Sequence, residues 1–582
     1  MLNPTHPNSG HLRTRRLWYA APARMKSPEP TAPAAATPPS APPETEAPQA
    51  GLARSASIVG LATMSSRVLG LVRDSALAAI FGAGNAMDAF HVAFRIPNLL
   101  RDLFAEGTMS AAFVPTFTRR LTHDGRESAW ALGRQLISAL VVITGVLVIT
   151  GIVLAEPLAR LFAKDFADVP GKLELTVSLA RVMLPFLTLV AVAAACMGML
   201  NSLHRFFAPA LSPAMFNVSV IASAMLLVPL MPRLGLEPIM AIAFGVVVGG
   251  VGQIGLQYWA LHREGFRYRP ALDPRDRGLR KILGLMGPGT VAGAAVQVNL
   301  LVNTMLATSQ GTGAVTWLTF AFRLMYLPIG VLGMSIATAA LPVLSRQAAR
   351  DEHAAMRSTV SQGLRLMLVL MVPATVGLIV LAEPIVRVIF ERGEFTSVDT
   401  RATALALACY APGIIGYSAV RLTVPTFYAL GTSLTPAYVS VGSMVLNIVL
   451  NLTLVRVLGY QGLALGTAIA ALANAAMLLA LLRPRLGGLD GASLGTCLAK
   501  IGIAAGVMGF VVRAADTWVT TRWPDPSFAT TALTLGSEIA LGLVVLAGMA
   551  GVLRIVEFTT ALRHLTRRLR RACGAIQNDM VR

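Results

Sequence analysis

Leu-Ala-Glu-Pro, at positions 154–157, recurs at positions 381–384, so the same tetrapeptide appears twice at an offset of 227. The tripeptide Ala93-Phe94-Arg95 recurs as Ala321-Phe322-Arg323 at an offset of 228. Three pairs of prolines share the first offset: Pro115 with Pro342, Pro185 with Pro412, and Pro209 with Pro436. Because several matches share nearly one offset, the sequence predicts two copies of one structural unit.

The repeated sequence is too apolar for a water-soluble fold. Of its 582 residues, 55% are hydrophobic and only 13% are charged, whereas soluble chains carry about 25% charged residues. Apolar runs of about 20 residues recur along the chain, and that is the length of a helix that crosses a bilayer. Barrel strands would instead alternate in short segments. The predicted class is therefore an all-α polytopic membrane protein.

About fourteen spans are expected, with boundaries near residues 55–81, 87–115, 134–155, 175–200, 211–231, 238–260, 281–306, 314–342, 362–381, 401–429, 435–457, 461–482, 494–513 and 531–554. Each repeat then holds six spans, an even number, so both copies face the same way. We expect two six-helix lobes, residues 54–260 and 281–482, related by an axis along the membrane normal, with a substrate site between them. Spans 13 and 14, within residues 494–554, lie outside the repeat.

The charge of the chain is concentrated in its loops and ends. The net charge is +20, and Lys and Arg gather after spans 2, 6 and 8 and in the tail, residues 555–582. Basic loops on one side place the N- and C-termini in the cytoplasm, and no nucleic-acid partner is expected. Residues 1–50 are basic and then rich in Pro and Ala, which predicts disorder. Whether residues 1–50 are translated in the cell stays open.

Ionisable groups inside spans are costly and mark substrate or ion pathways. In span 1, Arg67 and Asp74 are seven residues apart on one helical face and could pair. Arg73 is expected to point elsewhere unless Gly70 bends the helix, and we favour a functional role for it. For Arg67 a structural pair and a substrate contact are both open.

Span 2 carries a run of polar residues: Asp88, Arg95, Asn98, Arg101, Asp102 and Glu106. Asp88, Arg95 and Asp102 are spaced by seven residues, so they form one stripe. Membrane segments flank this span, and the stripe is therefore expected to line water inside the bundle. Arg101 is the favoured substrate contact. Asp102 and Glu106 are expected to act as its structural counter-charges.

Arg323 lies in an apolar part of span 8, and no acid lies within one turn of it. An arginine without an acid in a membrane needs an anion, which makes a substrate its expected partner. Arg421 in span 10 is a weaker candidate, because it could cap a helix or reach the interface. Arg73, Arg101 and Arg323 together would converge between the lobes, and guanidinium forks suit the oxygens of a pyrophosphate.

The sequence holds no motif for catalysis or nucleotide hydrolysis. It has no P-loop, no zinc-protease motif and no nucleophile elbow, and its four cysteines lie far apart. We therefore expect no enzyme and no cofactor. Transport would draw on an ion gradient or on the membrane potential.

The charged block of spans 1 and 2 resembles a known family. The similar stretches are residues 66–74 (SRVLGLVRD), 81–84 (FGAG), 88–90 (DAF), 94–101 (FRIPNLLR), 104–107 (FAEG), 112–115 (AFVP) and 286–288 (MGP). They resemble the MurJ (MviN) family of lipid II flippases, within the multidrug/oligosaccharidyl-lipid/polysaccharide exporter superfamily. The likeness extends over roughly residues 54–560.

The resemblance implies a function and a site. It implies export of lipid II, the undecaprenyl-pyrophosphate-linked peptidoglycan precursor, from the cytoplasmic to the periplasmic leaflet of the bacterial inner membrane by alternating access. The essential cavity arginines of the family match Arg67, Arg73, Arg101 and Arg323, and its span-1 acid matches Asp74. Spans 13 and 14 would form a groove for the lipid tail.

Two departures from the family pattern concern charge. Some relatives place acids beside the span-8 arginine, where this chain has Phe322 and Tyr326. Some relatives bind sodium through aspartates, where the nearest candidates here are neutral: Asn303, Asn447, Asn451 and Thr467. Asn447 and Asn451 share a helical face, so the four could coordinate an ion. Hydrogen bonding between helices is the favoured interpretation.

Alternative functions remain open at this point. An exporter of another polyprenyl-linked glycan would bind the same pyrophosphate. An exporter of cationic drugs is disfavoured by the arginines. A non-transporting scaffold, bound to cell-wall synthesis proteins, would not need the cavity charges.

Overall fold

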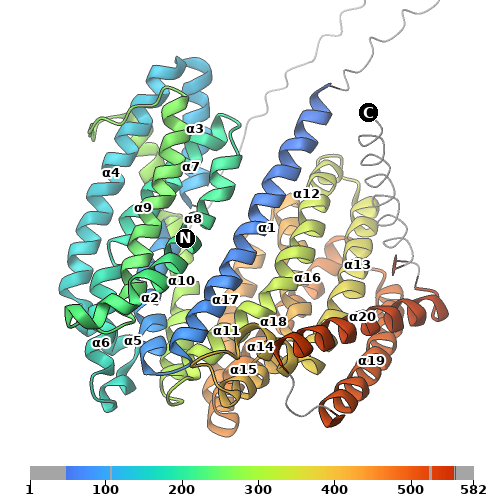
Figure 1. Cartoon of the computed structure of the whole chain (residues 1–582). Helices are drawn as coiled ribbons and strands as arrows, with labels where there is room; N and C mark the ends of the chain where they lie inside the picture. Colours follow the sequence, from blue (N-terminus) through green and yellow to red (C-terminus); the bar gives the residue numbers. More distant parts are fainter. Residues whose placement is uncertain (1–46, 105–107, 523–526, 556, 559–582) are drawn as a thin grey trace, which may run out of the picture. The chain divides into compact units, whose positions relative to one another are not determined.

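The computed structural model describes residues 47–104, 108–522, 527–555 and 557–558. The described residues from Ser55 onward belong to one compact unit, and the sites discussed below lie in it. All regular elements in the described ranges are helices, shown in Figure 1. The fold is therefore all-α, as predicted.

The first half of the chain contains α1 (Ala47–Phe81), α2 (Asn85–Phe104), α3 (Thr108–His123), α4 (Gly125–Val153), α5 (Ala155–Phe162), η1 (Lys164–Asp168), α6 (Lys172–Met183), α7 (Phe186–Ser202), α8 (Phe207–Leu226), η2 (Val228–Leu234) and α9 (Met240–Arg263). The second contains α10 (Arg277–Thr308), α11 (Ala314–Pro328), η3 (Ile329–Gly333), α12 (Met334–Ala349), α13 (His353–Val380), α14 (Ala382–Phe390), α15 (Ser397–Tyr410), α16 (Gly413–Ala429), α17 (Leu434–Leu458) and α18 (Tyr460–Arg485). Two further helices follow, α19 (Gly491–Arg522) and α20 (Phe528–Val552).

The internal repeat is visible in the order and packing of the helices. Helices α14, α16 and α17 start at the repeat offset from α5, α7 and α8, their counterparts in the first half. In the N-lobe (α1–α9) α2 packs on α6, α7 on α9 and α8 on α9. In the C-lobe (α10–α18) the equivalent pairs are α11 with α15, α16 with α18 and α17 with α18. The prediction of two lobes related by an internal repeat, followed by two C-terminal helices, is confirmed.

The predicted count of fourteen spans is not confirmed. Within the described ranges nine helices are long and apolar enough to cross a membrane, or ten if the α15–α16 pair, bent by 44°, is one span. The four remaining predicted spans correspond to α1, to α2 with α3, to α10, and to α11 with α12. All four carry polar residues that line the central cavity described below.

Two short helices were missed by the sequence analysis. Helices α5 and α14 begin at the repeated Leu-Ala-Glu-Pro, where the proline lies in the first turn and needs no amide partner. Each helix is also supported by an ion pair between residues i and i+4, Glu156–Arg160 and Glu383–Arg387. The repeated tetrapeptide thus marks a helix start in each lobe.

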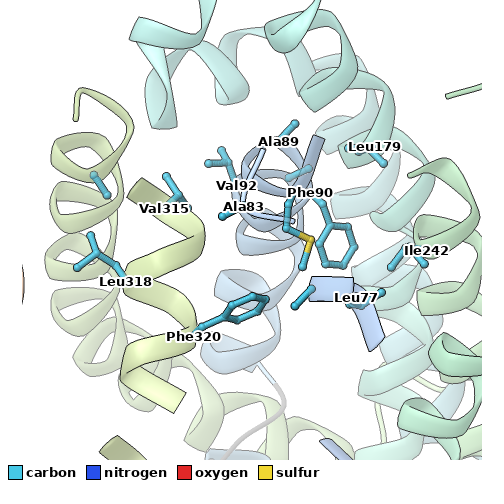
Figure 2. Close-up of a cluster of buried hydrophobic side chains, with 14 of the residues drawn as sticks. Leu77, Ala83, Ala89, Phe90, Val92, Leu179, Ile242, Val315, Leu318 and Phe320 are labelled. Carbon is cyan, nitrogen blue, oxygen red and sulfur yellow. The ribbon is translucent and has the colours of Figure 1, made fainter. Parts of the chain in front are cut away.

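One apolar cluster joins the two lobes. It contains residues from α1, α2, α6 and α9 of the N-lobe and from α11, α14 and α15 of the C-lobe. Figure 2 shows Leu77, Phe90 and Ile242 of the first lobe with Val315, Leu318 and Phe320 of the second. Because the cluster draws on both lobes near the end of α1 and the start of α2 and α11, the lobes are held together at that end of the bundle.

A buried carboxylate adds polar bonds at this end. Asp88 in α2 is fully buried; its side chain pairs with Lys172 at 3.1 Å and accepts bonds from the Gly313 amide at 2.7 Å and from Thr316. Gly313 and Thr316 open α11, so the carboxylate also sits at a helix N-terminus. We call this group the Asp88 clasp. The expectation that Asp88 lines water was wrong, because its oxygens are bonded within the protein.

A second contact between the lobes lies beside the clasp. The segment 391–396 follows α14, and its Glu394 amide donates to the Ala79 carbonyl of α1 at 3.0 Å. Gly393 has a φ of +56°, and a Cβ added there would overlap the Ala79 oxygen. Only glycine allows the two backbones to approach so closely.

Two other contacts place α10 and the C-terminal helices. Asp276 caps the start of α10 and accepts from Arg120 of α3 at 2.8 Å. Burial raises the pKa of Asp276, but the bonds from Arg120 and the Leu279 amide hold that pKa below its usual range. Helix α19 packs on α13 and on α20, and α20 also contacts α14 (Figure 1, red). The C-terminal pair therefore lies against the C-lobe.

Replacing Gly393 with Ala should weaken the contact between segment 391–396 and α1. The added Cβ collides with the Ala79 carbonyl, and alanine is strained at this φ, a cost of about 1–3 kcal/mol. We expect a lower thermal unfolding midpoint for the purified protein in detergent. Gly377→Ala in α13 is the matched control, because no atom lies within 4 Å of its added Cβ. Equal midpoints for both variants would contradict the prediction.

Replacing Asp88 with Asn should destabilise the protein strongly. Lys172 would be left buried without its counter-charge, which costs about 3–5 kcal/mol. The double variant Asp88→Asn with Lys172→Met removes that charge and should recover part of the loss, measured as the thermal unfolding midpoint. A double variant that loses as much as the two single variants together would show that the pair is not coupled.

Candidate functional site

Two neighbouring chambers lie between the helices that bear the predicted arginines. The first, of about 420 Å³, is lined by α2, α10, α11, α15, α16 and α18, and we call it the C-lobe chamber. The second, of about 520 Å³, is lined by α1, α2, α7, α8, α9 and α11, and we call it the N-lobe chamber. Phe94, Asn98 and Arg323 line both. The two chambers are therefore neighbours, with these three side chains between them, and we refer to them together as the cavity.

Arg73, Asp74 and Arg323 form an ionic triad across the two lobes. Asp74 in α1 is buried and pairs with Arg73 at 2.8 Å and with Arg323 of α11. Arg73 also donates to the Asn217 side chain of α8 at 3.0 Å, and its guanidinium lies 5.6 Å from the Phe216 ring. One carboxylate therefore serves two guanidinium groups, so the triad keeps a net positive charge.

The triad corrects two expectations. Arg323 does have an acidic partner, because α1 of the other lobe supplies Asp74, which no local sequence window could show. Asp74 does not pair with Arg67. The Arg67 guanidinium instead lies at Gly330 in the π-helical turn η3, where an added Cβ would overlap its Nη1 atom. The missing side chain of Gly330 leaves the room that Arg67 occupies.

Arg101 and Arg421 also have partners. Arg101 lines the N-lobe chamber and pairs with the adjacent Asp102 at 2.9 Å; each side chain is 30% exposed. Asp102 thus acts as the expected counter-charge, whereas Glu106 lies outside the described residues. Arg421 in α16 donates to the Tyr326 hydroxyl of α11 and lies 5.6 Å from its ring. It therefore links two helices of the C-lobe.

Arg95 lines the cavity, as expected for the polar stripe of span 2, and His91 joins it there. Both line the C-lobe chamber with Asn98. The atoms Arg95 Nε, His91 Nε2 and Asn98 Oδ1 are buried and have no hydrogen-bond partner among the described residues. Arg95 is also the repeat counterpart of Arg323, so the internal repeat indicates the same place in the cavity. Nothing in the sequence analysis singled out His91.

The four neutral candidates for an ion site form a hydrogen-bonded network. Asn451 donates to Asn303 at 2.7 Å and to Asn447 at 3.3 Å, and Asn447 donates to Thr467 at 3.4 Å. These bonds connect α10, α17 and α18, as the favoured interpretation expected. Asn303 and Thr467 also line the C-lobe chamber.

The cavity is chemically suited to a polar anion. The guanidinium groups of Arg73, Arg101 and Arg323 line the N-lobe chamber, and a guanidinium binds phosphate or carboxylate oxygens with two parallel bonds. Apolar helices surround the chambers, which strengthens such bonds relative to water. The arrangement can hold an anionic group between the lobes.

Comparison with known proteins identifies the family. The sequence model described as "Lipid II flippase MurJ" matches residues 77–534. The chain is 34% identical to the "Probable lipid II flippase MurJ" of Rhizobium meliloti, over 85% of this chain and 92% of that protein. It is 33% identical to the "Lipid II flippase MurJ" of Burkholderia cenocepacia, over 73% of this chain and 82% of that protein.

Solved structures agree on the fold. The inward closed conformation of lipid II flippase MurJ superposes with a TM-score of 0.69 at 24% identity, over 85% of this chain and 98% of that one. An inward-facing multidrug resistance MATE family transporter of the MOP superfamily gives a TM-score of 0.62 at 16% identity, over 74% and 99%. Because the family model matches most of the repeat and both named relatives align over most of the chain, this multi-pass membrane protein belongs to the MurJ family.

Proposed function

We propose that this protein is a lipid II flippase, which moves the undecaprenyl-pyrophosphate-linked precursor from the cytoplasmic to the periplasmic leaflet of the bacterial inner membrane. The observation that carries the proposal is the set of guanidinium groups from α1, α2 and α11 in a cavity between two repeated lobes. Family membership supports the same cargo. A pyrophosphate presents the oxygens that these groups bind best.

The direction of transport rests on the charges of the loops. Basic loops face the cytoplasm, and the turn between α3 and α4 is flanked by basic residues, Arg119 and Arg120 at the end of α3 and Arg126 at the start of α4. The Asp88 clasp lies at the opposite end of α2, so it faces the periplasm. The clasp and the segment 391–396 join the lobes there, which supports entry of lipid II into the cavity from the cytoplasmic side.

The triad of Arg73, Asp74 and Arg323 prepares the binding site for the pyrophosphate. Asp74 holds Arg73 and Arg323 at the centre of the cavity before substrate arrives. The pyrophosphate then competes with Asp74 for the two guanidinium groups and adds Arg101 of α2. Because Arg323 belongs to the C-lobe and Arg73 to the N-lobe, the bound anion changes the link between the lobes. Breaking the clasp then opens the periplasmic side.

Two parts of the proposed transport cycle remain: the position of the polyprenyl tail and the source of energy. The polyprenyl tail stays in lipid beside α19 and α20, which lie against the C-lobe. An ion gradient or the membrane potential drives the return step, since moving one charge across 100 mV supplies about 2.3 kcal/mol.

Removing the cavity arginines should abolish transport. In a bacterium depleted of its own lipid II flippase, the native chain should restore lipid II on the periplasmic face. Arg73→Ala, Arg101→Ala and Arg323→Ala should lower its appearance by about 10–100-fold, the value of one charge-assisted bond. Arg101→Lys should also be impaired, because an ammonium lacks the guanidinium fork.

Arg160→Ala is the control, since Arg160 is exposed on α5 away from the cavity. All variants must be shown to insert at native levels. Rescue by every cavity variant would disprove the arginine mechanism. Failure of a well-inserted native chain would point to a different polyprenyl-linked glycan or to a scaffold.

The orientation of the chain can be tested by reporter fusions. A fluorescent protein fused after Arg269, in the loop before α10, should fluoresce, because that loop is assigned to the cytoplasm. Alkaline phosphatase fused after Gln310, between α10 and α11, should be active, because that loop is assigned to the periplasm. Active phosphatase at Arg269 would reverse the proposed direction of transport.

A further inference from the structure

The C-lobe chamber contains polar atoms that the pyrophosphate site does not use. Arg95, His91, Asn98 and Asn299 line this chamber. Each has one buried side-chain atom without a hydrogen-bond partner among the described residues: Arg95 Nε, His91 Nε2, Asn98 Oδ1 and Asn299 Oδ1. An unsatisfied buried polar group costs about 1–3 kcal/mol. Four such atoms around one cavity indicate that the cavity receives a polar ligand.

Arg95 differs from the other cavity arginines in its charge balance. Arg73 and Arg323 share Asp74, and Arg101 pairs with Asp102. Arg95 forms no ion pair with any side chain in the described ranges. Asp102 acts on Arg95 electrostatically but forms no ion pair with it, so the guanidinium can still bind an anion from outside the protein.

The internal repeat explains why Arg95 lacks an acid. Arg95 and Arg323 are repeat counterparts, and Arg323 receives its acid from α1. The counterpart of α1 is α10, since the ends of the two helices, at Phe81 and Thr308, are related by the repeat offset. The α10 residues equivalent to Asp74 are Leu301 and Val302, which are apolar. Helix α10 therefore supplies no acidic partner for Arg95.

The C-lobe chamber contains both hydrogen-bond donors and acceptors, and this combination restricts the kind of ligand that it can bind. Arg95 Nε is a donor, whereas Asn98 Oδ1 and Asn299 Oδ1 are acceptors. A pyrophosphate offers only acceptor oxygens, so it cannot satisfy the two asparagine oxygens. A glycopeptide offers N–H and O–H donors together with carboxylates. This chamber is thus matched to an acidic glycopeptide rather than to a second phosphate or a neutral glycan.

We propose that the C-lobe chamber is a subsite for the glycopeptide part of the head group, with a peptide carboxylate bound by Arg95 and the neighbouring amides bound by His91, Asn98 and Asn299. This inference rests on the proposed function. The pyrophosphate occupies Arg73, Arg101 and Arg323 in the N-lobe chamber. Arg323 and Asn98 line both chambers, so one head group spans the two.

The test compares three ligands on the purified full-length chain in lipid nanodiscs. They are lipid II, lipid II whose peptide carboxylates have been converted to amides, and undecaprenyl pyrophosphate, which lacks the glycopeptide. Arg95→Gln should weaken lipid II binding about tenfold and leave undecaprenyl pyrophosphate binding unchanged. Arg101→Gln should weaken both. Arg160→Gln, on the exposed face of α5, is the matched control and should weaken neither.

Comparing two ligands on the native chain gives a result that does not depend on whether a variant folds correctly. The native chain should bind amidated lipid II about tenfold more weakly than lipid II, and Arg95→Gln should add no further loss for the amidated ligand. Equal loss of lipid II and undecaprenyl pyrophosphate in Arg95→Gln would overturn the subsite, as would equal binding of amidated and native lipid II. Failure of the native chain to bind lipid II at all would instead count against the proposed function.

Discussion

Asp74 is a single carboxylate buried between two guanidinium groups, one from its own helix and one from the opposite lobe. An arginine deep in a bundle of apolar helices needs a counter-charge, and two arginines with one acid leave a positive charge that the protein itself does not neutralise. The position of α1 against α11, the room for Arg67 at Gly330 and the bond from Arg73 to Asn217 all follow from this arrangement. The cavity exists because these charges must be kept away from lipid while remaining within reach of a ligand.

The contact between the lobes at the other end of the cavity depends on a carboxylate, Asp88, whose charge and hydrogen bonds are fully satisfied. Asp88 is satisfied by an ammonium group, two amides and a hydroxyl, so it attracts no ligand and holds the lobes together. Both acids belong to the conspicuous charges of the first two spans, and only their partners distinguish a binding group from a structural one. Each partner set comes from distant parts of the chain, apart from the adjacent Arg73.

Local patterns in the sequence therefore predicted the fold better than the site. The repeat and the apolar runs sufficed for the two lobes, and the repeated tetrapeptide lies at the helix starts at Ala155 and Ala382. These patterns could not show that Arg323 meets Asp74, that Asp88 meets Lys172, or that Arg95 faces the chamber without an acid.

The apolar pair Leu301 and Val302, opposite Asp74 in the repeat, has a consequence for the cargo. A duplicated fold with the same charges in both halves would present a two-fold symmetric surface, on which a molecule could bind equally well either way round. One half of this cavity has an acid between its arginines and the other does not. A molecule with chemically different ends is then accepted in one orientation only, which keeps its lipid-bearing end toward the same side of the protein on every turnover.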